Sequence, residues 1–159
     1  MATWQFDCVL FPRTSQPRAA RSGRQLLRDG SEELWSGRSL ESLVEELEKV
    51  LGKADPTWTP DVVMWGANDS TCLLLAAIGG AIEELRLRID MRVPEDDHRE
   101  RVLGFARKLD LVVATEVGDI VEPRLQSLMS SAARSRAGEF VKDPERYLAA
   151  LESVPMELW

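Results

Sequence analysis

Histidine is nearly absent from this chain, since His98 is the only one in 159 residues. Nucleophilic and acid–base sites usually need a histidine, so such chemistry would depend on His98 alone. It lies in the sequence DDHRE, where Asp96 or Asp97 could orient it as a base, but an exposed surface histidine is the favoured interpretation. The GxSxG, P-loop and HExxH motifs are also missing. The sequence therefore predicts no catalytic residues and no enzyme.

Cysteine is scarce as well, with only Cys8 and Cys72. Two thiols cannot form a disulfide framework or a four-thiolate metal site, and one histidine excludes a Cys₂His₂ zinc site. Both cysteines fall in predicted strands, where buried, reduced thiols are expected. A cation site at Glu95, Asp96 and Asp97 is the remaining alternative, although acids at a helix start are favoured by the helix dipole alone. No metal and no cofactor are predicted.

Long apolar runs are missing, and none approaches the ~20 residues that a membrane helix needs. The first residues, MATWQFD, have neither a basic region nor an apolar core of the kind found in signal peptides. We therefore expect no membrane association and a cytoplasmic location.

Basic residues are outnumbered, with 20 Lys and Arg against 27 Asp and Glu, which gives a net charge of −7. Such an acidic chain is a poor general binder of nucleic acid, because affinity for phosphate backbones comes largely from Lys and Arg. Residues 1–38 do hold six arginines against four acids, but no aromatic residue alternates with the arginines to stack bases. We expect 13–37 to be a long Arg-rich loop or excursion, in which an extra hairpin or short helix could lie.

The sequence contains two clear hydrophobic patterns, one typical of a helix and one typical of a β-hairpin. Leu40, Leu43, Val44 and Leu47 recur at helical spacing after Ser39, a residue suited to an N-cap, and Gly52 suits the end of that helix. The two segments TCLLLAAI and IEELRLRIDMR flank Gly79 and Gly80, and the second alternates apolar and charged residues. This pattern predicts an antiparallel hairpin with a tight turn.

The remaining chain adds a first strand in WQFDCVLF, short strands in DVVMWG, LVVAT and IVEP, and three later helices. These helices are expected after Pro94, from Pro123 and from Asp143-Pro144. The order predicts one domain over 1–159, with 152–159 as a tail. Its class is α+β: an antiparallel sheet of four to six strands with helices packed mainly on one face.

Residues 58–151, about 60% of the chain, carry a resemblance to a known type of protein. They contain a strand ending in Trp-Gly, a hairpin ending in Arg88-Ile89-Asp90-Met91-Arg92, and a late helix with a Ser-Ala pair before an Asp-Pro helix. This layout resembles small bacterial immunity proteins, which neutralise polymorphic or secretion-delivered toxins. The resemblance implies a non-enzymatic protein that binds one cognate toxin, and it transfers no functional residues, because immunity contacts differ between partners.

The leading hypothesis is therefore a protein-binding domain that blocks a toxin, since an acidic inhibitor associates rapidly with a basic nuclease-type toxin. Alternatives are a small enzyme or ligand-binding domain that uses an arginine-lined sheet face, and a module that acts as a homodimer. The candidate partner-binding residues are an acidic helix face, one loop tryptophan and the sheet arginines: Glu41, Glu45, Glu46, Glu48, Trp58, Arg86, Arg88 and Arg92.

Overall fold

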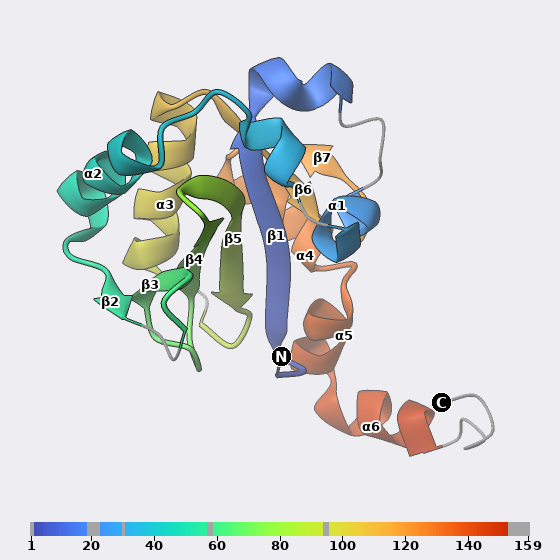
Figure 1. The fold of residues 1–159 in the computed structure, drawn as a ribbon. Coiled ribbons are helices and arrows are strands. Elements are labelled where there is room, and N and C mark those ends of the chain that lie inside the picture. Colours follow the sequence, from blue (N-terminus) through green and yellow to red (C-terminus); the bar gives the residue numbers. More distant parts are fainter. Residues whose placement is uncertain (1, 19–22, 30, 57–58, 94–95, 153–159) are drawn as a thin grey trace.

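The computed structural model describes residues 2–18, 23–29, 31–56, 59–93 and 96–152 (Figure 1). Its strands are β1 (Gln5–Pro12), β2 (Asp55–Pro56), β3 (Val62–Gly66), β4 (Cys72–Ile78), β5 (Ala81–Asp90), β6 (Leu111–Thr115) and β7 (Ile120–Val121). Its α-helices are α1 (Gly23–Asp29), α2 (Leu40–Leu51), α3 (Asp97–Lys108), α4 (Leu125–Ala132), α5 (Arg136–Lys142) and α6 (Pro144–Glu152). Two 3₁₀ helices, η1 (Arg13–Arg18) and η2 (Glu32–Trp35), complete the elements.

The strands form one sheet in the order β2-β3-β4-β5-β1-β6-β7, and every pairing is antiparallel. The predicted α+β class is confirmed. The sheet has seven strands, but β2 and β7 have only two residues each. Without these two, the number of strands is five, and the prediction was four to six. The first strand in the chain thus lies inside the sheet, between β5 and β6.

The central strands bury one face of the sheet completely. Cys8 lies opposite Leu87, and Leu10 lies opposite Leu85, so their side chains share that face. Leu85 and Leu87 are fully buried, whereas Arg86 and Arg88, which alternate with them, are only half-buried. The alternation that predicts the hairpin therefore also defines a hydrophobic face and a polar face.

The β4–β5 turn follows the glycine prediction. Gly79 and Gly80 have φ angles of +59° and +82°, a left-handed conformation that glycine adopts without strain. Two consecutive residues of this kind are typical of the type I′ hairpin turn.

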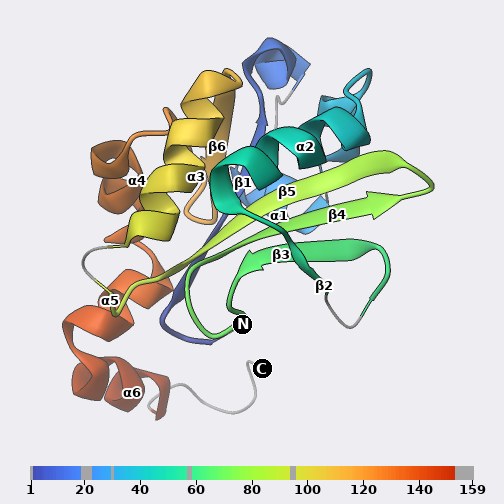
Figure 2. The same ribbon diagram turned by 90° about the vertical axis from the view of Figure 1, so that its left-hand side faces the viewer.

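Helices α2, α3 and α4 cover the hydrophobic face, with α2 and α3 side by side (Figure 2). Helix α2 buries Leu43 and Leu47, as its spacing predicts, and Ser39 Oγ accepts a hydrogen bond from the Ser42 amide at 3.2 Å. The Trp65 indole of β3 donates to the Gly52 carbonyl at 2.9 Å, which ties the end of α2 to the sheet.

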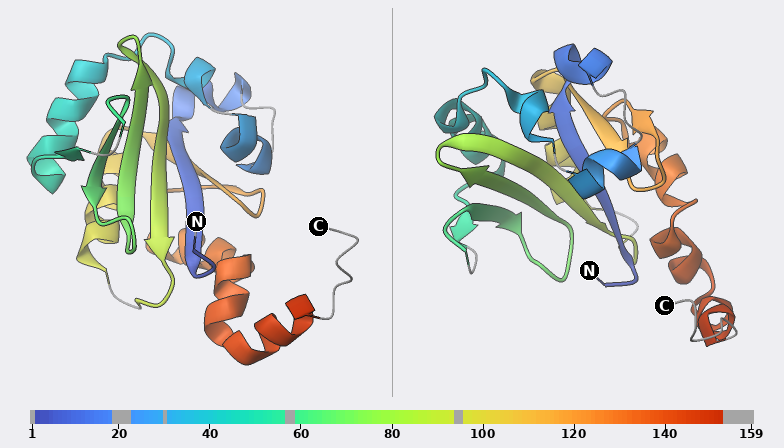
Figure 3. Two further views of the ribbon diagram at one scale, coloured as in Figure 1. Left: turned by 60° about the horizontal axis from the view of Figure 1, so that its bottom comes forward. Right: turned by 45° about the vertical axis from the view of Figure 1, so that its right-hand side comes forward.

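Residues 13–37, expected as a long loop or excursion in which a short helix could lie, form short helices in their described part. The segment contains η1, α1 and η2, and it buries Leu26, Leu34 and Trp35. Helix α1 lies on the polar face, where Arg86 of β5 donates to the Leu27 carbonyl at 3.2 Å (Figure 3). Its short length and mixed composition hide the helical period, so the sequence pattern did not reveal it.

The C-terminal helices differ partly from expectation. Helix α4 begins at Leu125, two residues after the predicted start at Pro123. Helix α6 begins at Pro144 with the Asp143 carboxylate capping it, as predicted. Helix α5 was not predicted; Ser135 caps it by accepting from the Gly138 amide. The tail was expected at 152–159; Glu152 ends α6, and the rest of that segment, 153–159, lies outside the described residues.

Both cysteines are buried and free, as predicted. They are not neighbours in the sheet. Cys8 on β1 and Cys72 on β4 lie on opposite sides of β5, and they face opposite surfaces, because one pairs with Leu87 and the other with Arg88.

Candidate protein-binding surface

Three carboxylates line the exposed side of α2. Glu41, Glu45 and Glu48 are all exposed, and their spacing of four and three residues places them in one stripe along the helix. Within the described part of the chain none of the three forms an ion pair. We call these residues the α2 stripe.

The stripe does not stabilise the helix that carries it. Like charges three or four residues apart destabilise a helix by about 0.2–0.5 kcal/mol per pair. Glu41 in the first turn is favoured by the helix dipole, but Glu48 lies in the last turn, where negative charge is disfavoured. The carboxylates of the α2 stripe are exposed and form no ion pair within the described residues, although the charge of Glu45 acts on Lys49.

Glu46, predicted as a member of the same surface, has a different role. It accepts from Lys49 at 2.7 Å and from Lys108 of α3 at 2.8 Å. These two ammonium groups lower the pKa of Glu46 to about 2. Glu46 therefore links α2 to α3 and is not available to a partner in the way that the stripe is.

The arginines of β5 lie on the opposite face of the sheet and are already paired. Asp7 of β1 is 4% exposed and accepts from Arg86 at 3.2 Å and from Arg88 at 3.0 Å. Arg86 also donates to Glu84 at 2.6 Å, and Arg88 donates to Asn68 at 3.3 Å. These guanidinium groups link β5 to β1 and to the loop between β3 and β4, which leaves little capacity for a ligand.

Arg92 extends this pattern beyond the end of β5. Its guanidinium donates to Asp90 at 2.6 Å and lies 4.3 Å from the centre of the Trp4 ring. Hydrogen bonding from Arg92 lowers the pKa of Asp90. The structure thus separates the predicted arginines from the acidic helix, and Trp58 lies outside the described residues.

His98 is not the exposed histidine that the sequence favours. It is half-buried, and its Nε2 atom is shielded from solvent without a hydrogen-bond partner in the described structure. Burial lowers its pKa from the ordinary value of 6.5. Asp96 does not orient the imidazole; its carboxylate caps α3 by accepting from the amides of His98 and Arg99, at 2.9 and 3.2 Å.

A cavity of about 580 Å³ lies beside His98 and is lined also by Ser70, Thr71, Asp96 and Asp97. Asp96 is engaged as the helix cap, and the Ser70 hydroxyl donates to the Ala67 carbonyl at 3.2 Å. Over the described ranges, no group of three or more His, Cys, Asp or Glu residues is placed to hold a metal ion.

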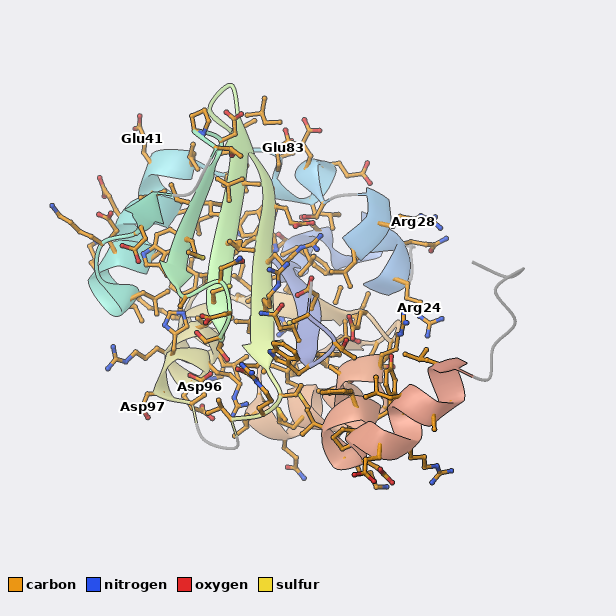
Figure 4. All side chains as sticks on the ribbon, turned by 90° about the horizontal axis from the view of Figure 1, so that it is seen from below. Arg24, Arg28, Glu41, Glu83, Asp96 and Asp97 are labelled. Carbon is orange, nitrogen blue, oxygen red and sulfur yellow. The ribbon has the colours of Figure 1, made fainter. Side chains whose placement is uncertain are left out.

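Sequence reasoning missed a second acidic region at the end of the sheet that carries the β4–β5 turn. Glu32 and Glu33 of η2 are exposed there, and Glu83 of β5 is half-buried. Figure 4 places Glu83 and Glu41 at this end, and Asp96 and Asp97 at the other. The segment EELW at 32–35 is too short to show a hydrophobic period, so the sequence could not predict where these residues lie.

No helix among the described residues is long and apolar enough to cross a membrane. Comparison with known protein families finds no match, and no curated protein or solved structure matches the chain.

Proposed function

We propose that this protein is an immunity protein, which binds a cognate basic toxin directly and blocks it. The observation that carries the proposal is the α2 stripe: three exposed carboxylates in a row that form no ion pair in the described structure, although the charge of Glu45 also acts on Lys49. Opposite charge on a partner would both attract it and set its orientation.

The charge of the whole chain supports the same proposal. The net charge is −7, and the residues after 38 hold about −9 of it, because residues 1–38 carry a net +2. A toxin that cuts nucleic acid must attract phosphate, and so tends to carry a positive surface. An acidic surface on the inhibitor competes for that same positive surface.

The ligand-binding alternative has less support. It needs arginines that are free to receive an anion, whereas Arg86 and Arg88 already share Asp7.

The proposal is tested by capturing the partner from the cells that produce this protein, with the tagged full chain as bait at moderate salt. The expected result is one stoichiometric basic protein that arrests growth when expressed alone and no longer does so when this chain is co-expressed. Capture of no such protein, or of one whose toxicity this chain does not relieve, would contradict the proposal.

A matched pair of variants tests the surface. The stripe variant Glu41→Gln, Glu45→Gln, Glu48→Gln removes three charges while keeping good helix-forming residues. The control variant Glu100→Gln, Glu139→Gln, Glu145→Gln removes three exposed charges elsewhere. We expect the stripe variant alone to capture less partner and to relieve less toxicity.

A further inference from the structure

A cavity of about 150 Å³ lies where the segment at the start of β1, the loop after β6 and the helices α5 and α6 meet. Its lining includes Thr3 and Gln5 at that start, Glu116 after β6, Arg136 of α5 and Tyr147 of α6. Figure 1 shows this end of β1 beside α5. Pockets for drug-sized ligands have volumes of ~300–1,000 Å³, so an occupant of this cavity is smaller. We call this feature the α5 cavity.

Contacts within the protein fix the walls of the α5 cavity. The Gln5 side chain accepts from the Ala2 amide at 3.0 Å and donates to the Asn68 carbonyl at 2.9 Å. The Phe140 and Tyr147 rings pack edge to face, with their centroids 5.7 Å apart. A ligand would therefore meet a preformed site, which lowers the entropic penalty of binding.

Glu116 supplies the negative charge of the cavity. It is half-buried, and it forms no ion pair with any residue that the structure describes. Burial raises the pKa of Glu116 and the charge of Asp7 adds to this, whereas hydrogen bonding from the Asp7 backbone and the charges of Arg136 and Arg24 oppose it. The ionised carboxylate is thus disfavoured in the protein alone, and a cation bound in the cavity would stabilise it.

Arg136 and Tyr147 supply hydrogen-bond donors to the same cavity. Arg136 is exposed, and its Nε donates to the Tyr147 hydroxyl at 3.3 Å. In the described part of the chain, the two terminal nitrogens of Arg136 have no hydrogen-bond partner, and the Tyr147 hydroxyl donates to no acceptor. The terminal N–H groups of a guanidinium bind a carboxylate through parallel hydrogen bonds. A carboxylate is therefore the ligand group that fits this side of the cavity.

The two opposite charges of the cavity do not pair with each other. Glu116 and Arg136 are too far apart for a direct ion pair, although the charge of Arg136 still acts on Glu116. A ligand with both an ammonium group and a carboxylate can contact both side chains at once. In an α-amino acid one carbon atom joins these two groups, which keeps the ligand small enough for the cavity.

We propose that the α5 cavity binds a free α-amino acid. The ammonium group of the ligand contacts the Glu116 carboxylate, and its carboxylate accepts from the terminal N–H groups of Arg136 and from the Tyr147 hydroxyl. Because these side chains belong to the loop after β6, to α5 and to α6, the bound ligand joins the C-terminal helices to the sheet. The inference is independent of the proposed function, since the cavity includes neither the α2 stripe nor the arginines of β5.

The first test titrates L-alanine into the ¹⁵N-labelled full chain and follows the amide signals by NMR. Only the ammonium and carboxylate groups make the proposed contacts, so L-alanine is a sufficient probe. We expect saturable shifts of the Glu116, Ala137 and Tyr147 amides, with a Kd on the order of 1 mM for so small a ligand. Shifts that do not saturate, or that spread evenly over the charged residues of the surface, would overturn the inference.

Two analogues test the two ends of the ligand on the unsubstituted chain. N-acetyl-L-alanine lacks the ammonium group, and L-alaninamide lacks the carboxylate. Each should bind roughly tenfold more weakly than L-alanine, because each loses one charge-assisted contact. An analogue that binds as tightly as L-alanine would overturn the inference.

Single substitutions assign each end of the ligand to its protein group. In Glu116→Gln, L-alanine and N-acetyl-L-alanine should bind equally, and in Arg136→Gln the same should hold for L-alanine and L-alaninamide. Tyr147→Phe keeps the ring and should weaken the binding of L-alanine severalfold. Glu145→Gln, on α6 but outside the lining of the cavity, is the control and should change nothing. Analogue preferences that persist in Glu116→Gln and Arg136→Gln would contradict the assigned contacts.

Stability separates a lost contact from a lost fold. Glu116→Gln removes a carboxylate whose charge is disfavoured, so its melting temperature should not fall. If a variant does not fold, the comparison of L-alanine with its two analogues on the unsubstituted chain still decides the question. The inference and the proposed function fail separately, because L-alanine tests the α5 cavity and capture of a toxin tests the proposed function.

Discussion

Asp7 is the residue on which the polar face of the sheet depends most. It is buried on β1, and its two carboxylate oxygens accept from Arg86 and Arg88 of the neighbouring strand. The sequence places both arginines on one face by alternation, but it gives no sign that an acid on a distant strand pairs with them. Only the register of β1 against β5, with Asp7 opposite Arg88, brings these groups together.

Removing the charge of Asp7 should therefore destabilise the fold strongly. Asp7→Asn leaves two half-buried guanidinium groups without their shared partner, and we expect the free energy of unfolding to fall by about 3 kcal/mol. Asp110→Asn is the control, since its ion pair with Arg13 is largely exposed and should contribute at most about 1 kcal/mol. Chemical denaturation measures both, and equal losses would contradict this account.

The single histidine allows a direct test of its environment. Burial lowers the pKa of His98, the nearby charge of Asp96 opposes this shift and that of Arg101 adds to it. We expect the C2–H proton signal of His98 to titrate with a midpoint below 6.5. A midpoint at or above that value would support the exposed histidine that the sequence favours.

The same shift links His98 to stability. Its folded-state pKa lies below its unfolded value, so the unfolded chain binds the proton more readily. The contribution of neutral His98 to the stability of the fold is complete above its pKa in the unfolded chain. This contribution is lost as the pH falls through its pKa in the folded protein. His98→Gln should reduce this loss of stability below pH ~6.5, as measured by thermal unfolding at several pH values, and an unchanged pH dependence would count against burial.

At the scale of elements, α2 and the β4–β5 hairpin are the parts that the sequence predicts best, because each has a long run at one clear period. The short elements are the ones it misses. Helices α1 and α5 have seven residues each, too few to show a helical period, and η2 has four. The sequence therefore could not predict that η2 buries Leu34 and Trp35 against the fold.

The two faces of α2 should respond oppositely to substitution. The stripe variant removes only exposed, unpaired charges, so we expect its free energy of unfolding to stay within about 0.5 kcal/mol of the wild type. Leu47→Ala on the buried face should reduce it by about 2–5 kcal/mol. A large loss in the stripe variant, measured by denaturation, would mean that the carboxylates serve the fold.

At the scale of the whole molecule, charge is separated across the structure. The acidic residues of α2 lie away from Arg24 and Arg28 of α1, and Figure 4 shows Glu41 and these arginines on opposite sides. Such a separation orients a charged partner during encounter and raises the association rate. The sequence predicts the acidic helix, whereas its position relative to α1 depends on the long-range pairing of β1.

The most direct test of the central claim is the association rate of the captured partner with the wild type, the stripe variant and the control variant, at low and high salt. Screening shortens the range of charge interactions to about 10 Å at 0.1 M salt. We predict that the stripe variant alone associates several-fold more slowly at low salt and that all three rates converge at high salt. Equal rates for the three proteins at low salt would contradict binding through the α2 stripe.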